Sequence, residues 1–303
     1  MYHDFNFKDV LASSVRAAWQ IEDILPPGSA LDFEKPFLPE SLARTAEAPG
    51  LSDAKKLVLN HVRGHEYLSM FGLVEEFILP FVLDHARPQL DGDDHQVRAM
   101  LNFAGEEAKH IHLFRQFHSL FTGSFGSDCG VIGPPAAIGA KVLSHDPLAV
   151  ALLILHIEWM SQSHYVGSIR DAGELDPLFK SLLKHHWMEE AQHAKLDTLM
   201  VAELAKGRDE AGIDKAIDEY LELGAFLDDG LRSQAELNAA ALETATGRAL
   251  PTETAGALIA QQHQALRWTY IGSGMTHPKF VKTLETLSPA ARDRIAAVAP
   301  AFC

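Results

Sequence analysis

The chain carries the same five-residue pattern twice, and this repeat limits what its helices can enclose. The first copy runs from Glu106 to His110 as Glu-Glu-Ala-Lys-His, and the second runs from Glu189 to His193 as Glu-Glu-Ala-Gln-His. Residues three apart share one face of a helix, so each copy directs a carboxylate and an imidazole into the same space. Two such copies, each following another glutamate in an apolar segment, predict a dinuclear metal site inside a four-helix bundle.

The two glutamates of each copy are expected to have different roles. Only the second one, Glu107 or Glu190, stands three residues before the histidine. The ligands predicted from the two motifs are therefore Glu107, His110, Glu190 and His193. The preceding acids, Glu106 and Glu189, are expected to contact the ligand side chains instead of the metals.

Each motif also follows a glutamate that lies in an apolar stretch of sequence. Glu158 precedes Glu190, and Glu76 precedes Glu107, at nearly the same distance along the chain. This spacing is typical of two antiparallel helices joined by a loop. A carboxylate buried in an apolar helix is costly unless a partner compensates its charge, and two divalent ions would compensate four glutamates. Glu158 and Glu76 are therefore predicted ligands.

The upstream ligand of the first motif has an alternative in Glu75. The offset between the two motifs aligns Glu158 with Glu75, whereas the order of glutamate, aromatic and aliphatic residues aligns Glu158 with Glu76. We take Arg63 and Lys56 as markers of the solvent-exposed face of this helix. On that helical wheel Glu76 lies nearer the buried side, so we favour Glu76 over Glu75.

Two further residues near the second motif could belong to the site. His186 lies four residues before Glu190 on the same helical stripe, so it could provide a third imidazole ligand. A surface histidine beside His185 is the alternative. Asp197 lies four residues after His193 and could accept a hydrogen bond from a ligand imidazole. An exposed pair of the two side chains is the alternative for Asp197.

Composition excludes several classes of partner. The net charge is −15, which argues against binding to nucleic acid or to an anionic membrane. Two cysteines, Cys129 and Cys303, provide neither a disulfide framework nor a thiolate metal site. A reducing, cytoplasmic location is expected, since the start of the chain lacks a signal-peptide pattern. The longest apolar run, from Leu148 to Leu155, is too short to span a bilayer.

Helix signals dominate the chain and predict an all-α fold. Residues 1–50 contain several prolines and are expected to form a short helix and an irregular wrapping segment. Residues 51–207 are predicted to form the four-helix bundle, and residues 208–303 a helical extension packed on it. Caps and breakers place the four helices at about 52–84, 93–122, 146–173 and 176–207. The segment 123–139 is rich in Gly, Pro and Ser, and is predicted to be the long connection between two helical pairs.

The paired motifs resemble those of the ferritin-like di-iron carboxylate proteins. Glu106 and Glu189 match the acid that often precedes the ligand glutamate in that family, whereas Lys109 and Gln192 stand where arginine is usual. The resemblance covers about residues 55–205. It implies a ferritin-like four-helix bundle with additional helices at the N- and C-terminal ends.

The spacing of His186, Glu190 and His193 is similar to that of the para-aminobenzoate N-oxygenase branch, which oxidises an arylamine nitrogen. This resemblance implies two iron ions, reductive activation of O2 and a small organic substrate. An external electron donor is expected, because the chain has no flavin, nicotinamide or iron-sulfur motif. Manganese or a mixed Fe/Mn centre is an alternative, since carboxylate and imidazole suit both metals.

Other functions stay open at this point. One is a ferroxidase or iron-binding protein without an organic substrate, and another is a di-iron oxygenase of an aliphatic substrate. An apolar tunnel would favour the aliphatic substrate, and a compact polar pocket near Tyr165 and Gln162 would favour an aromatic one. The last hundred residues could cover the site, extend the core or support a homodimer.

Overall fold

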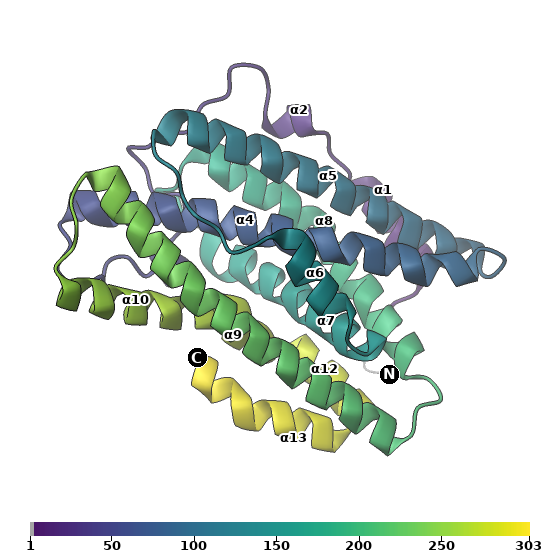
Figure 1. Ribbon diagram of the computed structural model, residues 1–303. Coiled ribbons are helices and arrows are strands. Elements are labelled where there is room, and N and C mark those ends of the chain that lie inside the picture. Colours follow the sequence, from purple (N-terminus) through teal and green to yellow (C-terminus); the bar gives the residue numbers. More distant parts are fainter. Residues whose placement is uncertain (1–2) are drawn as a thin grey trace.

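Four long helices form the centre of the computed structural model, which describes residues 3–303 (Figure 1). The central helices are α4 (Asp53–Ala86), α5 (Asp94–Phe125), α7 (Pro147–His164) and α8 (Pro177–Ala205). α4 packs along α5, and α7 packs along α8. Residues 3–303 contain no β-strand. The predicted all-α fold, with a four-helix bundle and further helices at both ends, is confirmed.

Shorter helices precede the bundle, and others follow it. Before α4 lie α1 (Phe7–Ala17), α2 (Ile21–Ile24) and α3 (Glu40–Ala43). After α8 lie α9 (Glu210–Thr246), α10 (Thr252–Arg267), α11 (Ser273–Met275), α12 (Pro278–Leu287) and α13 (Pro289–Val298). Single turns of other helix types are η1 (Arg87–Gln89), η2 (Tyr165–Ile169), η3 (Trp268–Gly272) and η4 (Ala299–Phe302). α1 packs on α5 and α8, whereas α9 packs across α4 and α7 (Figure 1).

All four bundle helices begin within one residue of their predicted starts, and three of them have aspartate caps. The side chains of Asp93, Asp146 and Asp176 each accept a hydrogen bond from a backbone N–H in the first turn of α5, α7 and α8. The expected end of α5 before Gly123 was wrong by about one turn. The helix continues to Gly126, whose φ of 78° is the left-handed conformation that ends helices.

Two other boundaries differ from the predictions. The segment 123–139, predicted to be the long connection between two helical pairs, includes the start of a further helix, α6 (Pro135–Leu143), which packs on α4. Pro135 occupies its first position, where a backbone N–H would have no helical partner. The third bundle helix ends at His164 and continues only as the wider turn η2, short of Gly173.

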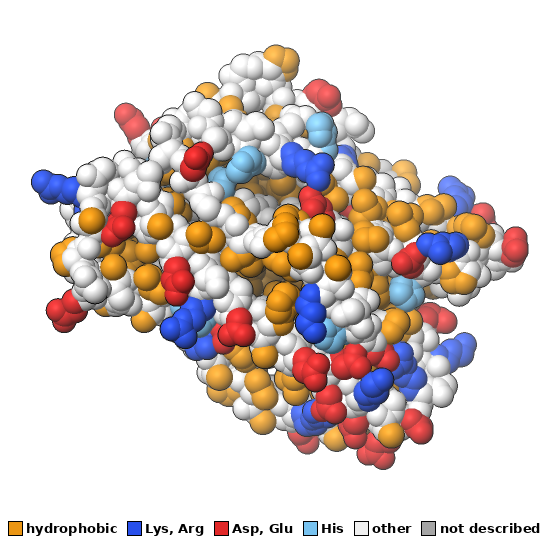
Figure 2. All heavy atoms as spheres, viewed as in Figure 1, with side chains coloured by type: hydrophobic (Ala, Val, Ile, Leu, Met, Phe, Trp, Pro, Cys, Tyr) orange, Lys and Arg blue, Asp and Glu red, His pale blue; other side chains and the backbone are white. Residues whose placement is uncertain are grey.

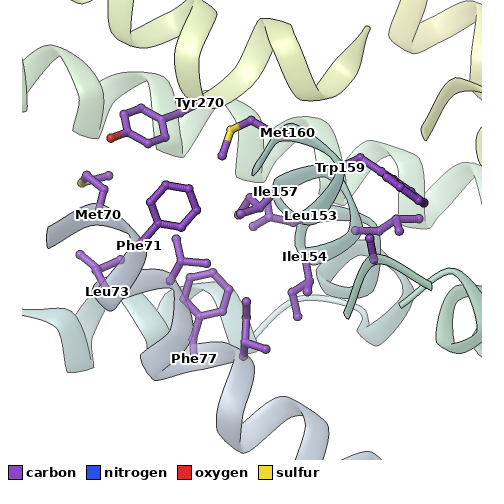
Figure 3. Packing of buried hydrophobic residues seen from close by; sticks show 14 of the residues in the cluster. Met70, Phe71, Leu73, Phe77, Leu153, Ile154, Ile157, Trp159, Met160 and Tyr270 are labelled. Atoms are coloured by element: carbon purple, nitrogen blue, oxygen red, sulfur yellow. The ribbon is translucent and has the colours of Figure 1, made fainter. Parts of the chain in front are cut away.

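The core of the bundle surrounds α7 on all sides. Met70, Phe71 and Phe77 of α4 lie opposite Ile154 and Ile157 of α7 (Figure 3). Every residue of α7 between positions 148 and 161 is buried, as expected for a helix that is apolar around its whole circumference. A charged residue on α7 is therefore placed inside the bundle, away from water.

The surface differs from one part of the molecule to another. On the face in Figure 2, charged side chains gather over the C-terminal helices, and hydrophobic side chains surround a central hollow. Within residues 3–303, no helix combines the length and the apolar character needed to cross a bilayer.

A buried polar network joins α4 to the C-terminal helices. Arg63 is 0% exposed, and its Nε donates to Oε2 of Glu66 at 2.9 Å. Nη1 of Arg63 also donates to Oε1 of Gln262 at 2.7 Å, and the hydroxyl of Tyr270 donates to Oε1 of Glu66 at 2.6 Å. The use of Arg63 as a marker of the solvent face was therefore wrong. The division of the chain at residues 50 and 207 stays a prediction.

Candidate metal centre

The two repeated motifs face each other between α5 and α8. Nδ1 of His193 lies 3.0 Å from Oε1 of Glu107, and Nδ1 of His110 lies 3.1 Å from Oε1 of Glu190. All four side chains are buried. The helices thus bring together the carboxylate and imidazole groups that the repeat predicted to meet.

α4 contributes Glu75 to this cluster, and not Glu76. Oε1 of Glu75 lies 2.9 Å from Nε2 of His186 and 3.6 Å from Nδ1 of His110. The side chain of Glu76 is 34% exposed and accepts a hydrogen bond from Nη2 of Arg115 at 2.7 Å. The preference for Glu76 is therefore corrected, and Glu75 takes its place. The helical wheel was misleading because the C-terminal helices cover the face of α4 that we took to be exposed.

The remaining two predicted ligands also lie inside the bundle. His186 is buried, and its Nε2 lies 3.0 Å from Oε1 of Glu190, so it is not a surface histidine. Glu158 of α7 is 2% exposed, and its Oε2 is buried without a hydrogen-bond partner. Burial and the negative charge of Glu190 raise the pKa of Glu158 well above its usual range, which reflects how close the two carboxyl groups lie.

Six of these seven side chains, all except Glu158, form two overlapping sets that could each hold one metal ion. One set is Glu75, His110, His186 and Glu190, and the other is Glu107, His110, Glu190 and His193. The candidate ligand atoms of each set lie within 4.8 Å of one another. A helical bundle that directs glutamates and two Glu-x-x-His motifs inward is the ferritin-like arrangement, as predicted.

The unpaired polar atoms of the cluster fit two bound cations. Both carboxylate oxygens of Glu107, one oxygen of Glu75 and Nδ1 of His110 are buried without a hydrogen-bond partner. Burial and the charge of Glu75 raise the pKa of Glu107, because several carboxylates share one space that excludes water. Two divalent ions would bind these lone pairs and offset the repulsion.

The first glutamate of each motif contacts the histidine of the other motif. Nε2 of His110 lies 2.8 Å from Oε2 of Glu189, and Nε2 of His193 lies 2.9 Å from Oε2 of Glu106. When Nε2–H donates to a carboxylate, the lone pair of the imidazole is on Nδ1, which faces the cluster. Each motif therefore orients the imidazole of the other.

Two side chains that the motif analysis did not assign support these contacts. Nζ of Lys109 lies 2.5 Å from Oε1 of Glu189. Lys109 therefore provides a positive charge at the motif position where the family that the motifs resemble usually has arginine. Ser14 of α1 donates from Oγ to Oε1 of Glu106 at 2.6 Å. The position of Lys109 inside the motif could have indicated that it contacts the site. Nothing in the sequence indicates the contact of Ser14, because Ser14 is 92 residues away from Glu106.

Asp197 does not have the contact that we predicted. Its side chain is buried, which also excludes the alternative of an exposed pair, and its Oδ2 has no hydrogen-bond partner. Nε2 of His193 is bonded to Glu106 instead. Burial raises the pKa of Asp197 well above its usual range. The prediction that Asp197 accepts a hydrogen bond from a ligand imidazole is therefore corrected, because Glu106 is the partner of Nε2 of His193.

The variant Glu189→Ala is expected to bind added Fe(II) about 10–100-fold more weakly, as happens when a ligand histidine loses its orienting partner. Glu189→Gln should recover part of the affinity, because its amide oxygen still accepts a hydrogen bond. Competition with a coloured chelator measures the effect, with Glu203→Ala on the exposed side of α8 as a control. Equal affinities of Glu189→Ala and the unaltered protein would contradict the orienting role.

Comparison with known proteins gives structural matches only. No family model and no curated protein matches the chain. One similar structure is a glycine-to-leucine variant of an R2-like ligand-binding oxidase with an aerobically reconstituted Fe/Fe cofactor. It is 17% identical over 86% of this chain and 91% of that chain, with a TM-score of 0.47. A tyrosine-to-phenylalanine variant with an anaerobically reconstituted Mn/Fe cofactor is 13% identical over 86% and 93%, with a TM-score of 0.48.

Proposed function

We propose that this protein is a dinuclear non-haem iron enzyme that uses O2 to oxidise a small organic substrate. The observation that carries the proposal is the pair of overlapping, buried carboxylate and imidazole sets. The proposed ligands are Glu75, Glu107, His110, Glu158, His186, Glu190 and His193. Such ligands suit iron, with manganese or a mixed centre as alternatives. When bound, two ferrous ions supply two electrons for the reductive activation of O2, and the protein supplies position and electrostatics.

Aromatic side chains limit the access of water to the proposed ligands. The rings of Phe71 and Phe114 lie 5.2 and 5.1 Å from the ring of His186. The ring of Phe103 lies 4.1 Å from that of His193. An apolar shell strengthens the interaction of the carboxylates with bound cations and keeps water away from reactive species.

The specific activity that we propose is arylamine N-oxygenation. The buried third imidazole, His186, supports it, because the resembling branch has three histidines in its site. The polar pocket considered near Tyr165 and Gln162 lends no support. Tyr165 stacks on Trp187 with ring centroids 4.4 Å apart, and Nε2 of Gln162 contacts the backbone oxygen of Trp187. A cavity of small-molecule size lies elsewhere, between α4 and α5.

The test is anaerobic reconstitution with Fe(II), followed by rapid mixing with O2 and an arylamine. We expect about two iron ions per chain and a product with oxygen on the nitrogen, labelled when labelled O2 is used. Absorbance follows the iron, and mass spectrometry detects the product. If both irons become ferric at a rate indifferent to arylamines and fatty aldehydes, with no organic product, the ferroxidase alternative replaces the proposal. Product from the aldehyde alone would favour the aliphatic alternative.

A further inference from the structure

A cavity of about 690 Å³ lies between α4, α5 and residues 131–135, outside the ligand cluster. A hollow edged by hydrophobic side chains is visible on this face (Figure 2). Its volume is that of a typical small-molecule site. Most of its lining is apolar, with Leu68 and Leu73 from α4, Phe117 from α5 and Ile132 from the connecting segment. The cavity is thus large enough and apolar enough to hold an organic ligand.

One aromatic side chain separates this cavity from the candidate metal centre. Phe114 lines the cavity, and its ring centroid is 5.1 Å from that of His186. Across the cavity wall, a Cβ added to Gly72 would lie 3.6 Å from Cβ of Phe114. A molecule in the cavity would therefore lie one ring away from a proposed ligand.

The charged groups that line the cavity are already paired. Glu76 and Arg115 are its two charged residues, and they form an ion pair at 2.7 Å. An anionic ligand would compete with Glu76 for Arg115, and a cationic ligand would compete with Arg115 for Glu76. Either exchange gains little, because Arg115 is 69% exposed and its pair with Glu76 is largely solvated. A charged ligand would in addition lose hydration against the apolar part of the lining. The lining therefore favours an uncharged ligand.

The uncharged polar part of the cavity lining consists of His65, His118, Ser69 and Ser119. Nε2 of His65 lies 2.8 Å from Nδ1 of His118, and Nδ1 of His65 is buried without a hydrogen-bond partner. Burial, and then the neighbouring His118, lower the pKa of His65 to about 4, so this ring is uncharged near neutral pH. Nδ1 of His65 is shielded from the cavity, whereas His118 is exposed and lines it, so the imidazole of His118 can form one hydrogen bond with a neutral polar group of a ligand.

The cavity extends along α4 from His65 to Glu76, whereas Arg115 and His118 on α5 are only one helical turn apart. His65 and Glu76 are eleven residues apart on α4, which corresponds to about 16 Å along the helix axis. Apolar side chains of both helices line the space between them. A ligand that fills the cavity is therefore elongated.

We propose that this cavity binds the substrate of the metal centre, and that the substrate is an uncharged, elongated and largely apolar molecule with one hydrogen-bonding group. The role of the bound molecule as a substrate rests on the oxidase function proposed above, whereas its binding in the cavity does not. Phe114 is then the side chain between the bound molecule and the oxidising centre. The inference restricts the arylamine proposal to arylamines without a charged second group, and the apolar lining equally fits the aliphatic alternative.

The test compares three compounds that share one apolar body and differ in charge. The probes are para-butylaniline, para-butylbenzoate and para-butylbenzylammonium, titrated calorimetrically into anaerobic, iron-loaded protein at neutral pH. We expect para-butylaniline to bind at least about tenfold more tightly than either ion, a difference of ~1.4 kcal/mol. Equal or tighter binding of either ion would overturn the inference.

Variants connect this binding to the cavity. Gly72→Leu should abolish it, because the new side chain enters the cavity beside Phe114. Gly256→Leu is the matched control, since Gly256 is an exposed helical glycine with no atom within 4 Å of an added Cβ. Ser119→Trp, on the exposed side of α5, narrows the cavity without altering the core and provides a second test. Circular dichroism and iron content show that each variant is folded.

The two proposals fail in different ways. If para-butylaniline does not bind, or binds Gly72→Leu and Ser119→Trp as well as the unaltered protein, the cavity inference is wrong even if iron still reacts with O2. If para-butylaniline binds in the cavity but iron-loaded protein oxidises no organic compound, the cavity stands as a ligand site and the oxidase function is wrong.

Discussion

Glu75→Ala is expected to lower the iron content after anaerobic reconstitution from about two ions per chain to about one, whereas Glu76→Ala leaves it unchanged. Glu75 places a buried carboxylate 2.9 Å from His186, inside one of the two ligand sets. Glu76, the next residue, is partly exposed and paired with Arg115. The two variants remove the same group at adjacent positions, so a difference between them reports the position of the carboxylate.

The same measurement separates ligands of one set from ligands of both. Glu107→Ala and His193→Ala should each lose about one ion, whereas Glu190→Ala should lose nearly all iron, because Glu190 belongs to both sets. Iron is counted by mass spectrometry after desalting, with the fold checked by circular dichroism. Two ions per chain in both Glu75→Ala and His193→Ala would show that the ligand assignment is wrong.

Arg63→Ala is expected to lower the free energy of unfolding by about 3–5 kcal/mol, the usual cost of removing one partner of a buried ion pair. Arg63 is wholly buried, and Glu66, its partner at 2.9 Å, is 1% exposed. The substitution leaves the Glu66 carboxylate uncompensated and takes a donor from Oε1 of Gln262. Urea unfolding followed by circular dichroism measures the change.

Two controls show whether the orphaned charge causes the loss. Arg170→Ala removes an exposed arginine whose partner is Asp171, and it should leave the unfolding midpoint unchanged. Adding Glu66→Gln to Arg63→Ala removes the buried charge and should recover part of the stability. A double variant no more stable than Arg63→Ala would mean that the loss has another cause, such as packing of the arginine side chain.

Much of the fold could be predicted because its signals are local. The aspartate caps Asp93, Asp146 and Asp176 determined where three bundle helices begin, since capping depends on residues within one turn. Helix ends were harder to predict. α5 continues past Gly123 to Phe125, because the ring of Phe125 stacks on those of Phe33 and Phe121 and favours one more turn of helix.

The candidate site was predictable in its motifs and less so in its neighbours. Glu107, His110, Glu190 and His193 follow from the period of a helix, and this period requires no tertiary structure. The contacts of Ser14 with Glu106 and of Lys109 with Glu189 connect separate helices. No spacing within one helix predicts a contact between two helices.

The sequence by itself determined that two helices direct Glu-x-x-His pairs inward, because that pattern is a property of single helices. Only the tertiary structure decided between Glu75 and Glu76. Arg63 has the charge of a surface residue, but Gln262 and Tyr270 from the C-terminal helices enclose the ion pair that it forms with Glu66. A helical wheel assumes that charged residues face water. A buried ion pair reverses that assumption, and with it the side of α4 that faces the metal site.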